Sequence, residues 1–322
     1  IPSPVLVFGG TGPVRTLALA RLGAESVEAG ARILWVGAPR AVWPLAHLPL
    51  REERLDARPT RADLGDSPWP ALNPFALEPG LSAEWLAYAV GESEPSERRR
   101  LAAALSHVLA DWSVGRAPWT PPSPEQALAM LSLRLPRLLE RLVARGRLPR
   151  STSGRVPFVA GSAQMTVVVG HVDDLVARES EIVLVILSFL TRALARPTEP
   201  HLVVIEDWVD RISPDARDLM AATLLDACRL APGLEVLVAS ATAAEWQTPS
   251  ALAFVDTATA LVAQSNVAWP ACWLAPALPV GLPPLDVSVI YALDRAIGGS
   301  TWRAYRLPAP AIPADDAAEV AP

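Results

Sequence analysis

Lysine is absent from this chain of 322 residues, so all 28 of its basic residues are arginines. Lysine is normally among the commonest residues, and its absence beside abundant alanine, leucine, proline and arginine is typical of a GC-rich genome. Any chemistry that needs a lysine side chain is excluded. With 34 acidic residues the net charge is −6, which excludes a strongly basic nucleic-acid footprint over the whole chain.

Cysteine, histidine and long apolar runs are also scarce. Cys228 and Cys272 stand in apolar surroundings, which indicates reduced core thiols and a cytoplasmic location. The histidines lack metal-ligand spacing and predict no site of their own; they are His47, His107, His171 and His201. The longest apolar run, 182–190, is about half of what a membrane span needs. The sequence therefore predicts neither a transmembrane segment nor a signal-peptide core.

The N-terminal segment has the pattern of a βαβ unit. An apolar strand over 5–8 runs into Gly9-Gly10-Thr11-Gly12, helical spacing follows over 17–28, and a second buried strand is expected at 33–36. A strand, a glycine loop, a helix and a further strand in this order predict a mainly parallel sheet flanked by helices.

Residues 9–16 partly fit the phosphate-binding pattern G-x-x-x-x-G-K-[ST]. In that pattern backbone N–H groups surround the phosphates, the lysine reaches the β- and γ-phosphates and the hydroxyl holds Mg²⁺. Gly9 and Thr16 fit, but Val14 replaces glycine and Arg15 replaces lysine. Pro13 also lacks the N–H that could bind a phosphate.

A dinucleotide-binding loop is the alternative, because Gly9-Gly10-Thr11-Gly12 is also similar to the loop of short-chain dehydrogenases. That alternative predicts an NAD(P)-binding protein. It requires a glycine where Arg15 stands, and that enzyme class uses a catalytic lysine that this chain lacks. The spacing therefore favours the phosphate loop.

Two carboxylates follow the apolar strand predicted at 202–205. In phosphoryl-transferring motors the first carboxylate of such a pair holds the Mg²⁺ shell and the second orients or deprotonates the attacking water. The usual order is Asp then Glu, whereas this chain has Glu206 then Asp207. Alternatively, the two residues cap a neighbouring helix or face solvent.

The remaining pattern divides the chain into an α/β core, a helical segment and a tail. We expect a core over 1–80 and 151–307, an all-α insertion over 81–150 and a disordered, Pro/Ala-rich tail over 308–322. Further strands are expected at 165–169, 235–239, 259–262 and 302–306. Further helices are expected from Asp173 to Ala195, after an N-cap at Ser213, and over 285–297 before Gly298-Gly299.

Together these motifs resemble the FtsK/HerA superfamily over most of residues 4–265. They are the glycine loop, Leu72-Asn73-Pro74-Phe75, the helical insertion and the segments 166–174, 203–207 and 236–240. The chain is most similar to the cytoplasmic ATPases of conjugation and type IV secretion systems. The resemblance implies a RecA-like P-loop NTPase fold, a hexameric ring that binds ATP and Mg²⁺ between subunits, and transfer of DNA or protein.

The resemblance also implies roles for individual residues. Gly9, Gly10, Gly12, Arg15 and Thr16 would bind the nucleotide, and Thr16 and Glu206 would hold Mg²⁺. Glu206 and Asp207 would be catalytic, and Arg229 would reach the γ-phosphate of the neighbouring subunit. Arg229 is equally explained as a cation that stabilises a helix C-terminus.

Several departures from the family pattern predict a degenerate site. Besides Pro13, Val14 and Arg15, alanine occupies position 241, where such motors carry a polar sensor. We therefore expect a structural or regulatory subunit of a larger assembly, with ATP hydrolysis weakened or lost; an active hexameric translocation ATPase is the alternative. Expected partners are protein subunits, with DNA as a further candidate, in the cytoplasm or at the inner face of the membrane.

Overall fold

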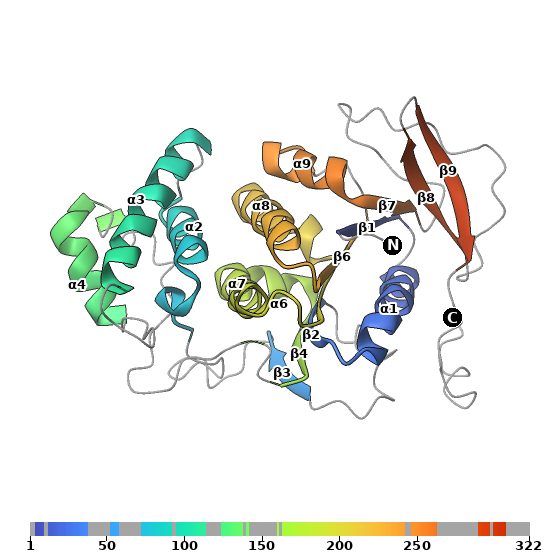
Figure 1. Cartoon of the computed structure of the whole chain (residues 1–322), viewed down its shortest axis with the longest axis horizontal. Helices are drawn as coiled ribbons and strands as arrows, with labels where there is room; N and C mark the ends of the chain where they lie inside the picture. The colour runs from blue at the N-terminus through green and yellow to red at the C-terminus, as the bar shows by residue number, and fades with distance from the viewer. Residues whose placement is uncertain are drawn as a thin grey trace.

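Figure 1 shows the computed structural model of the chain. It describes residues 4–9, 12–37, 52–57, 72–91, 95–113, 124–137, 140–141, 160, 163–241, 246–262, 289–296 and 299–306. Gly10, part of the predicted phosphate loop, lies outside these residues, as do the side chains of Pro13 and Val14. The predicted tail over 308–322 also lies outside them.

The described residues form a nine-stranded sheet in the order β3-β4-β2-β5-β6-β1-β7-β8-β9. The first seven strands of this order are parallel, and β8 and β9 continue the sheet antiparallel. The strands are β1 (Val5–Phe8), β2 (Arg32–Gly37), β3 (Glu52–Asp56), β4 (Met165–Val169), β5 (His201–Glu206), β6 (Leu234–Ser240), β7 (Thr259–Val262), β8 (Val289–Ala296) and β9 (Gly299–Arg306).

Helices cover both faces of the sheet, with α1 on one face and α6 to α9 on the other (Figure 1). They are α1 (Gly12–Glu28), α2 (Pro79–Ala89), α3 (Pro95–Ser113), α4 (Pro124–Arg134), α6 (Val172–Ala177), α7 (Glu179–Ala195), α8 (Pro214–Leu230) and α9 (Pro249–Thr257), with short 3₁₀ turns η3 (Pro74–Ala76) and η4 (Trp208–Asp210). Among the described residues, no helix combines the length and apolar content needed to cross a bilayer.

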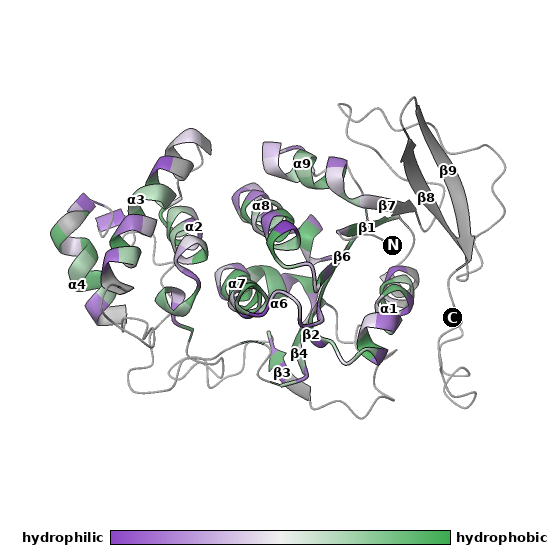
Figure 2. Cartoon of the chain, viewed as in Figure 1, coloured by the Kyte–Doolittle hydropathy of each residue, from purple (hydrophilic) through white to green (hydrophobic). Residues whose placement is uncertain are grey.

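Alternation along the strands builds the two cores. On β1, Leu6 and Phe8 belong to the cluster that contains the buried residues of α7 and α8, whereas Val5 and Val7 pack with those of α1. Successive strand residues point to opposite faces, so each parallel strand buries both of its faces. The apolar surface of α7 is plain in Figure 2, where this helix is mainly green.

Most of the expected elements are confirmed, including the parallel sheet, the strand expected at 302–306, which is the second part of β9, and the helix capped by Ser213, whose Oγ accepts the N–H of Ala216 at 3.2 Å. Two helix boundaries differ. The first helix begins at Gly12 and not at residue 17, and the helix expected from Asp173 breaks at Arg178, whose Nε donates to the carbonyl of Ala57 at 3.1 Å.

The helix predicted over 285–297 is wrong. Residues 289–296 form β8, which pairs with β7 and β9. Strand β3 and helix α9 were not expected. Helices α2 to α4 occupy the part of the chain assigned to the insertion, while the division into core and insertion stays a prediction.

His201, at the amino end of β5, yields a prediction about pH. Its Nδ1–H donates to the carbonyl of Glu199 at 2.8 Å, and Nε2 is buried without a partner among the described residues. Burial, assisted by the charges of Arg192 and Arg32, lowers the pKa of His201 below its usual 6.5. The folded state therefore favours neutral imidazole, and this contribution to stability is lost as pH falls below 6.5.

We expect the wild type to lose stability relative to His201→Gln between pH 7 and pH 5, since glutamine does not titrate. Urea unfolding of both proteins at pH 7, 6 and 5 measures this difference. Parallel stability curves for the two proteins would contradict it.

Candidate functional site

The carboxyl ends of β1, β5 and β6 meet at one edge of the sheet and bring the predicted motifs together. Strand β6 lies between the other two, so the segments that follow all three strands are adjacent. The N–H of Gly9 donates to the carbonyl of Ser240 at 3.2 Å, and the N–H of Asp207 donates to that of Ala239 at 3.2 Å. In open α/β sheets, ligands bind at this edge.

Arg15, at the lysine position of the phosphate loop, forms an ion pair with Asp207. Its Nε and Nη2 atoms bond the two oxygens of that carboxylate at 2.6 and 2.7 Å. Its Nη1 also donates to the carbonyl of Gly9 at 3.2 Å. The Arg15 side chain is 6% exposed and that of Asp207 is 26% exposed, so the guanidinium is shielded from water while the carboxylate is partly accessible. The guanidinium thus connects the loop after β1 to the loop after β5.

Gly12 places the start of α1 next to the same carboxylate. A methyl group added to Gly12 would lie 3.5 Å from Oδ2 of Asp207. The hydroxyl of buried Thr16 donates to the carbonyl of Gly12 at 3.0 Å, within the first turn of α1. The predicted metal-binding hydroxyl therefore takes part in a hydrogen bond of its own helix.

Glu206 is the buried carboxylate of the pair. Only 2% of the residue is exposed, and Oε2 has no hydrogen-bond partner among the described residues. Burial, assisted by the charge of Asp207, raises the pKa of Glu206 to about 8. Burial therefore favours the protonated carboxyl of Glu206 as long as no cation lies beside it.

Asp207 adopts a left-handed backbone conformation with φ of 54°. Asp and Asn enter this region more readily than most residues, although it still costs energy. The turn directs the Asp207 carboxylate toward Arg15, while Glu206 remains in strand β5. The two carboxylates therefore have separate environments although they are adjacent in sequence.

A third carboxylate, Asp210, was not anticipated from the sequence. It accepts a hydrogen bond from the Ser240 hydroxyl and another from the N–H of Ala241 at 2.6 Å. The indole N–H of Trp246 donates to the Ser240 hydroxyl at 3.2 Å. Burial raises the pKa of Asp210 to about 6. At the expected sensor position, Ala241 thus contributes its backbone N–H to Asp210.

Arg217 of α8 fixes the loop that carries these carboxylates. This arginine is 4% exposed and donates to the carbonyls of Val209, Asp210 and Ile212 at 2.9, 3.4 and 3.3 Å. Backbone carbonyls near a 3₁₀ turn are thereby satisfied inside the protein. Neither Asp210 nor Arg217 belongs to a motif, although the acidic residue three positions after Asp207 could have been noted.

Arg229 lies far along α8 from this edge. It pairs with Asp226 at 3.1 Å, and both side chains are more than half exposed. The position is near the helix C-terminus, as expected for the capping explanation. Its role toward a neighbouring subunit stays a prediction.

In the observed arrangement the arginine at the lysine position is bonded to Asp207 and Gly9, and burial favours the protonated form of the carboxyl expected to hold the metal. Within the described residues, no group of three or more His, Cys, Asp or Glu could hold a metal ion. No catalytic step through nucleotide or metal follows from this geometry.

Strand order also bears on the dinucleotide alternative. In the dinucleotide-binding order the first and second strands are neighbours. Here β1 pairs with β6 and β7, and β5 and β6 separate it from β2. The sheet order therefore disfavours an NAD(P)-binding protein.

Comparison with known proteins supports this fold. The structure of VirB4 of Thermoanaerobacter pseudethanolicus is similar with a TM-score of 0.54 and 14% identity, over 81% of this chain and 77% of that chain. The bacterial conjugative coupling protein TrwB, in a trigonal form with sulphate, has a TM-score of 0.47 and 13% identity, over 95% and 79% of the two chains. No family model and no curated protein matches the sequence. The VirB4 likeness confirms the predicted fold class, a RecA-like P-loop NTPase fold.

Proposed function

We propose that this chain is a subunit of a DNA- or protein-translocation assembly of the type IV secretion and conjugation class. Its ATP hydrolysis is weakened or lost, and its role is structural or regulatory. The fold shared with VirB4 and the family motifs of the sequence support the assembly. In this proposal the core spans 1–80 and 151–307, the insertion spans 81–150, and the subunit acts in the cytoplasm or at the inner face of the membrane.

The ion pair between Arg15 and Asp207 is the observation that carries the loss of hydrolysis. An arginine bonded through both Nε and Nη2 directs that edge of its guanidinium to Asp207 and not to a phosphate. The same pair occupies both oxygens of the carboxylate that would orient or deprotonate water. Arginine's fork geometry suits this two-point contact, which the single ammonium of lysine cannot reproduce.

An active hexameric ATPase is the second candidate. The buried Oε2 of Glu206 favours it, because the nearby indole of Trp35 is the one described donor for this carboxyl and a ligand would satisfy the oxygen once Arg15 has moved. For this function Arg15 must leave Asp207, and Glu206 must lose its proton. The proposed site residues are then Gly9, Gly10, Gly12, Arg15 and Thr16 for ATP, Thr16 and Glu206 for Mg²⁺, and Glu206, Asp207 and Arg229 for catalysis.

Mg-ATP binding and turnover separate the two candidates. We expect the purified chain to bind Mg-ATP more weakly than about 1 mM in calorimetry and to release no phosphate above the buffer rate. Arg15→Ala should leave both results unchanged. Micromolar binding with turnover near 1 s⁻¹ that Arg15→Ala abolishes would instead identify an active ATPase.

A gain-of-function variant sharpens this test. Restoring the motif with Val14→Gly and Arg15→Lys together should raise ATP affinity at least about tenfold if the rest of the site keeps its shape. Thr16→Val in the restored protein is the matched control, since it removes the hydroxyl expected to hold Mg²⁺. It should reverse the gain in the presence of Mg²⁺.

A further inference from the structure

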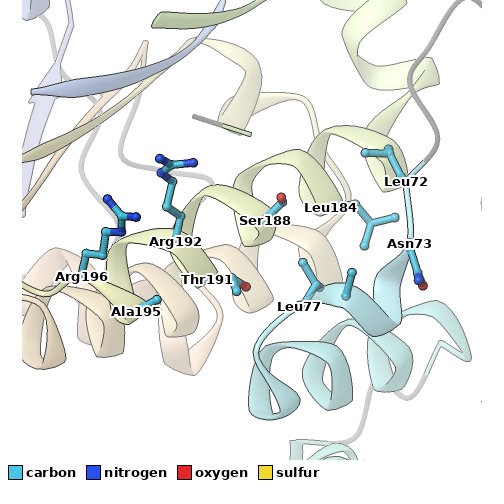
Figure 3. A pocket seen from close by; sticks show the side chains of 10 residues that line it. Leu72, Asn73, Leu77, Leu184, Ser188, Thr191, Arg192, Ala195 and Arg196 are labelled. Carbon is cyan, nitrogen blue, oxygen red and sulfur yellow. The ribbon is translucent and has the colours of Figure 1, made fainter. Parts of the chain in front are cut away.

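A second candidate site lies away from the loops described above. A pocket of about 240 Å³ lies between the segment that contains Leu72, Asn73, Ala76 and Leu77 and the side of α7 that runs from Leu184 to Ala195 and on to Arg196 (Figure 3). Arg196 follows α7 directly and precedes β5 by a few residues, so this end of α7 leads to the amino end of that strand. The candidate nucleotide site lies at the carboxyl end of the same strand. The two sites are therefore at opposite edges of the sheet.

The pocket has an apolar end and a cationic end. Leu72, Leu77 and Leu184 line one end, and Arg192 and Arg196 line the other. In Figure 3 the two arginine side chains extend to the same side of α7, away from the leucines. We call this cavity the α7 pocket. Its lining fits a ligand that carries an apolar group next to a negative charge.

Arg192 has no acceptor among the residues that the structure describes. No hydrogen bond or ion pair joins it to another described residue, and its Nε is fully buried. Arg196, by contrast, pairs with Glu199 at 3.0 Å. A ligand cannot reach Nε, but the two Nη atoms are solvent-accessible and have no acceptor among the described residues, so they can donate to a group from outside. Arg192 therefore provides the position for a negatively charged group.

Positive charge exceeds negative charge around Arg192. Burial, together with the charges of Arg32 and Arg196, lowers the pKa of Arg192, and Glu199 is the one carboxylate among the described residues that opposes this shift. The charges of Arg192 and Arg32 also lower the pKa of His201. The shifts at Arg192 and His201 therefore indicate a positive electrostatic potential near the amino end of β5, although the whole chain carries a net charge of −6.

We propose that the α7 pocket docks an extended segment of a partner protein, which places an apolar side chain against Leu184 and a carboxylate on Arg192. The volume accommodates about one large side chain, and a charge-assisted bond to a guanidinium gives the second point of contact. Nucleic acid fits less well, because the leucine end offers nothing to a phosphate backbone and two arginines make a short cationic surface. This inference is independent of the proposed function.

Selection from a random peptide library displayed on phage tests the docking site directly. The full chain is immobilised, and the bound peptides are sequenced. We expect enrichment of peptides with Asp or Glu within a few residues of Leu, Ile or Phe. The most enriched peptide is then synthesised with a fluorescent label, and its affinity is measured by anisotropy.

Variants assign that affinity to the pocket. Arg192→Ala should weaken the peptide at least about tenfold, by loss of a charge-assisted bond. Ala195→Trp, which fills the rim from an exposed position at the end of α7, should weaken it similarly. Arg100→Ala, an exposed arginine on α3, is the matched control and should leave the affinity unchanged. Thermal unfolding followed by circular dichroism checks that each variant is folded.

Three outcomes would overturn the proposal. One is a library without enrichment, and another is an enriched peptide that binds Arg192→Ala and Ala195→Trp as tightly as the wild type. The third concerns a labelled single- or double-stranded DNA oligonucleotide. If its affinity falls with Arg192→Ala while no acidic peptide is enriched, the pocket belongs to nucleic acid.

Discussion

Replacing Asp207 by asparagine lowers the free energy of unfolding by about 2 to 3 kcal/mol, because it leaves the guanidinium of Arg15 largely buried without a counter-charge. Asparagine keeps the tolerance for the left-handed backbone at this position, so the loss is one of charge and not of conformation. Arg15→Met should cost a similar amount. The double variant should cost no more than either single one, since neither partner is then left alone.

Urea unfolding of the four proteins measures this coupling. The matched control is Arg229→Ala, which breaks an ion pair in which both side chains are more than half exposed. It should change the free energy of unfolding by about 0.5 kcal/mol or less. Single costs that simply add in the double variant would show that Arg15 and Asp207 do not interact energetically.

Gly233→Ala should cost about 3 kcal/mol, because the backbone leaves no room for a methyl group there. The new Cβ would lie 2.3 Å from the carbonyl oxygen of Glu199 and 3.0 Å from that of Pro197. The N–H of Gly233 donates to Pro197, and its carbonyl accepts the N–H of His201. The segment that enters β5 therefore has to move, which costs more than shifting a side chain.

Gly23→Ala is the control for this prediction. Its new methyl would meet side-chain ends alone, that of Leu202 at 2.9 Å and that of Leu237 at 3.5 Å. The site is inside helix α1, where alanine is favoured over glycine by about 1 kcal/mol. The two effects oppose each other, so the net change should stay within about 1 kcal/mol. Equal losses from Gly233→Ala and Gly23→Ala in urea unfolding would refute the argument from backbone contact.

Much of the core could be predicted because the sequence pattern of each segment agrees with the burial and pairing that the segment has in the fold. The buried parallel strands are short apolar runs, and Ser213 with Pro214 has the chemistry of a helix start. For residues 289–296 the prediction of a helix was wrong, because the spacing of their apolar residues suits a helix as well as a strand. Pairing with β7 and β9 decides the outcome, and a tertiary contact of this kind is absent from a local pattern.

The sequence predicted where the candidate site lies, but not which of its residues bond one another. The glycine loop and the two carboxylates follow strands, so a parallel sheet brings them to one edge. That Arg15 bonds Asp207 while Glu206 stays buried depends on the left-handed turn at Asp207. The bonds from Ser240 and Ala241 to Asp210 depend on the adjacency of β5 and β6. Neither the turn at Asp207 nor the pairing of β5 with β6 can be predicted from the spacing of residues in one sequence.

Arg217 holds the loop over residues 209–212 through three hydrogen bonds to main-chain carbonyls, so the conformation of this loop does not depend on its side chains. The frame of residues 209–212 is anchored from α8, through main-chain atoms that every amino acid possesses. Side chains in this loop can therefore change over evolutionary time without collapse of the loop. A lineage can lose an enzymatic activity here and keep a surface of the same form, ready for reuse in assembly or control.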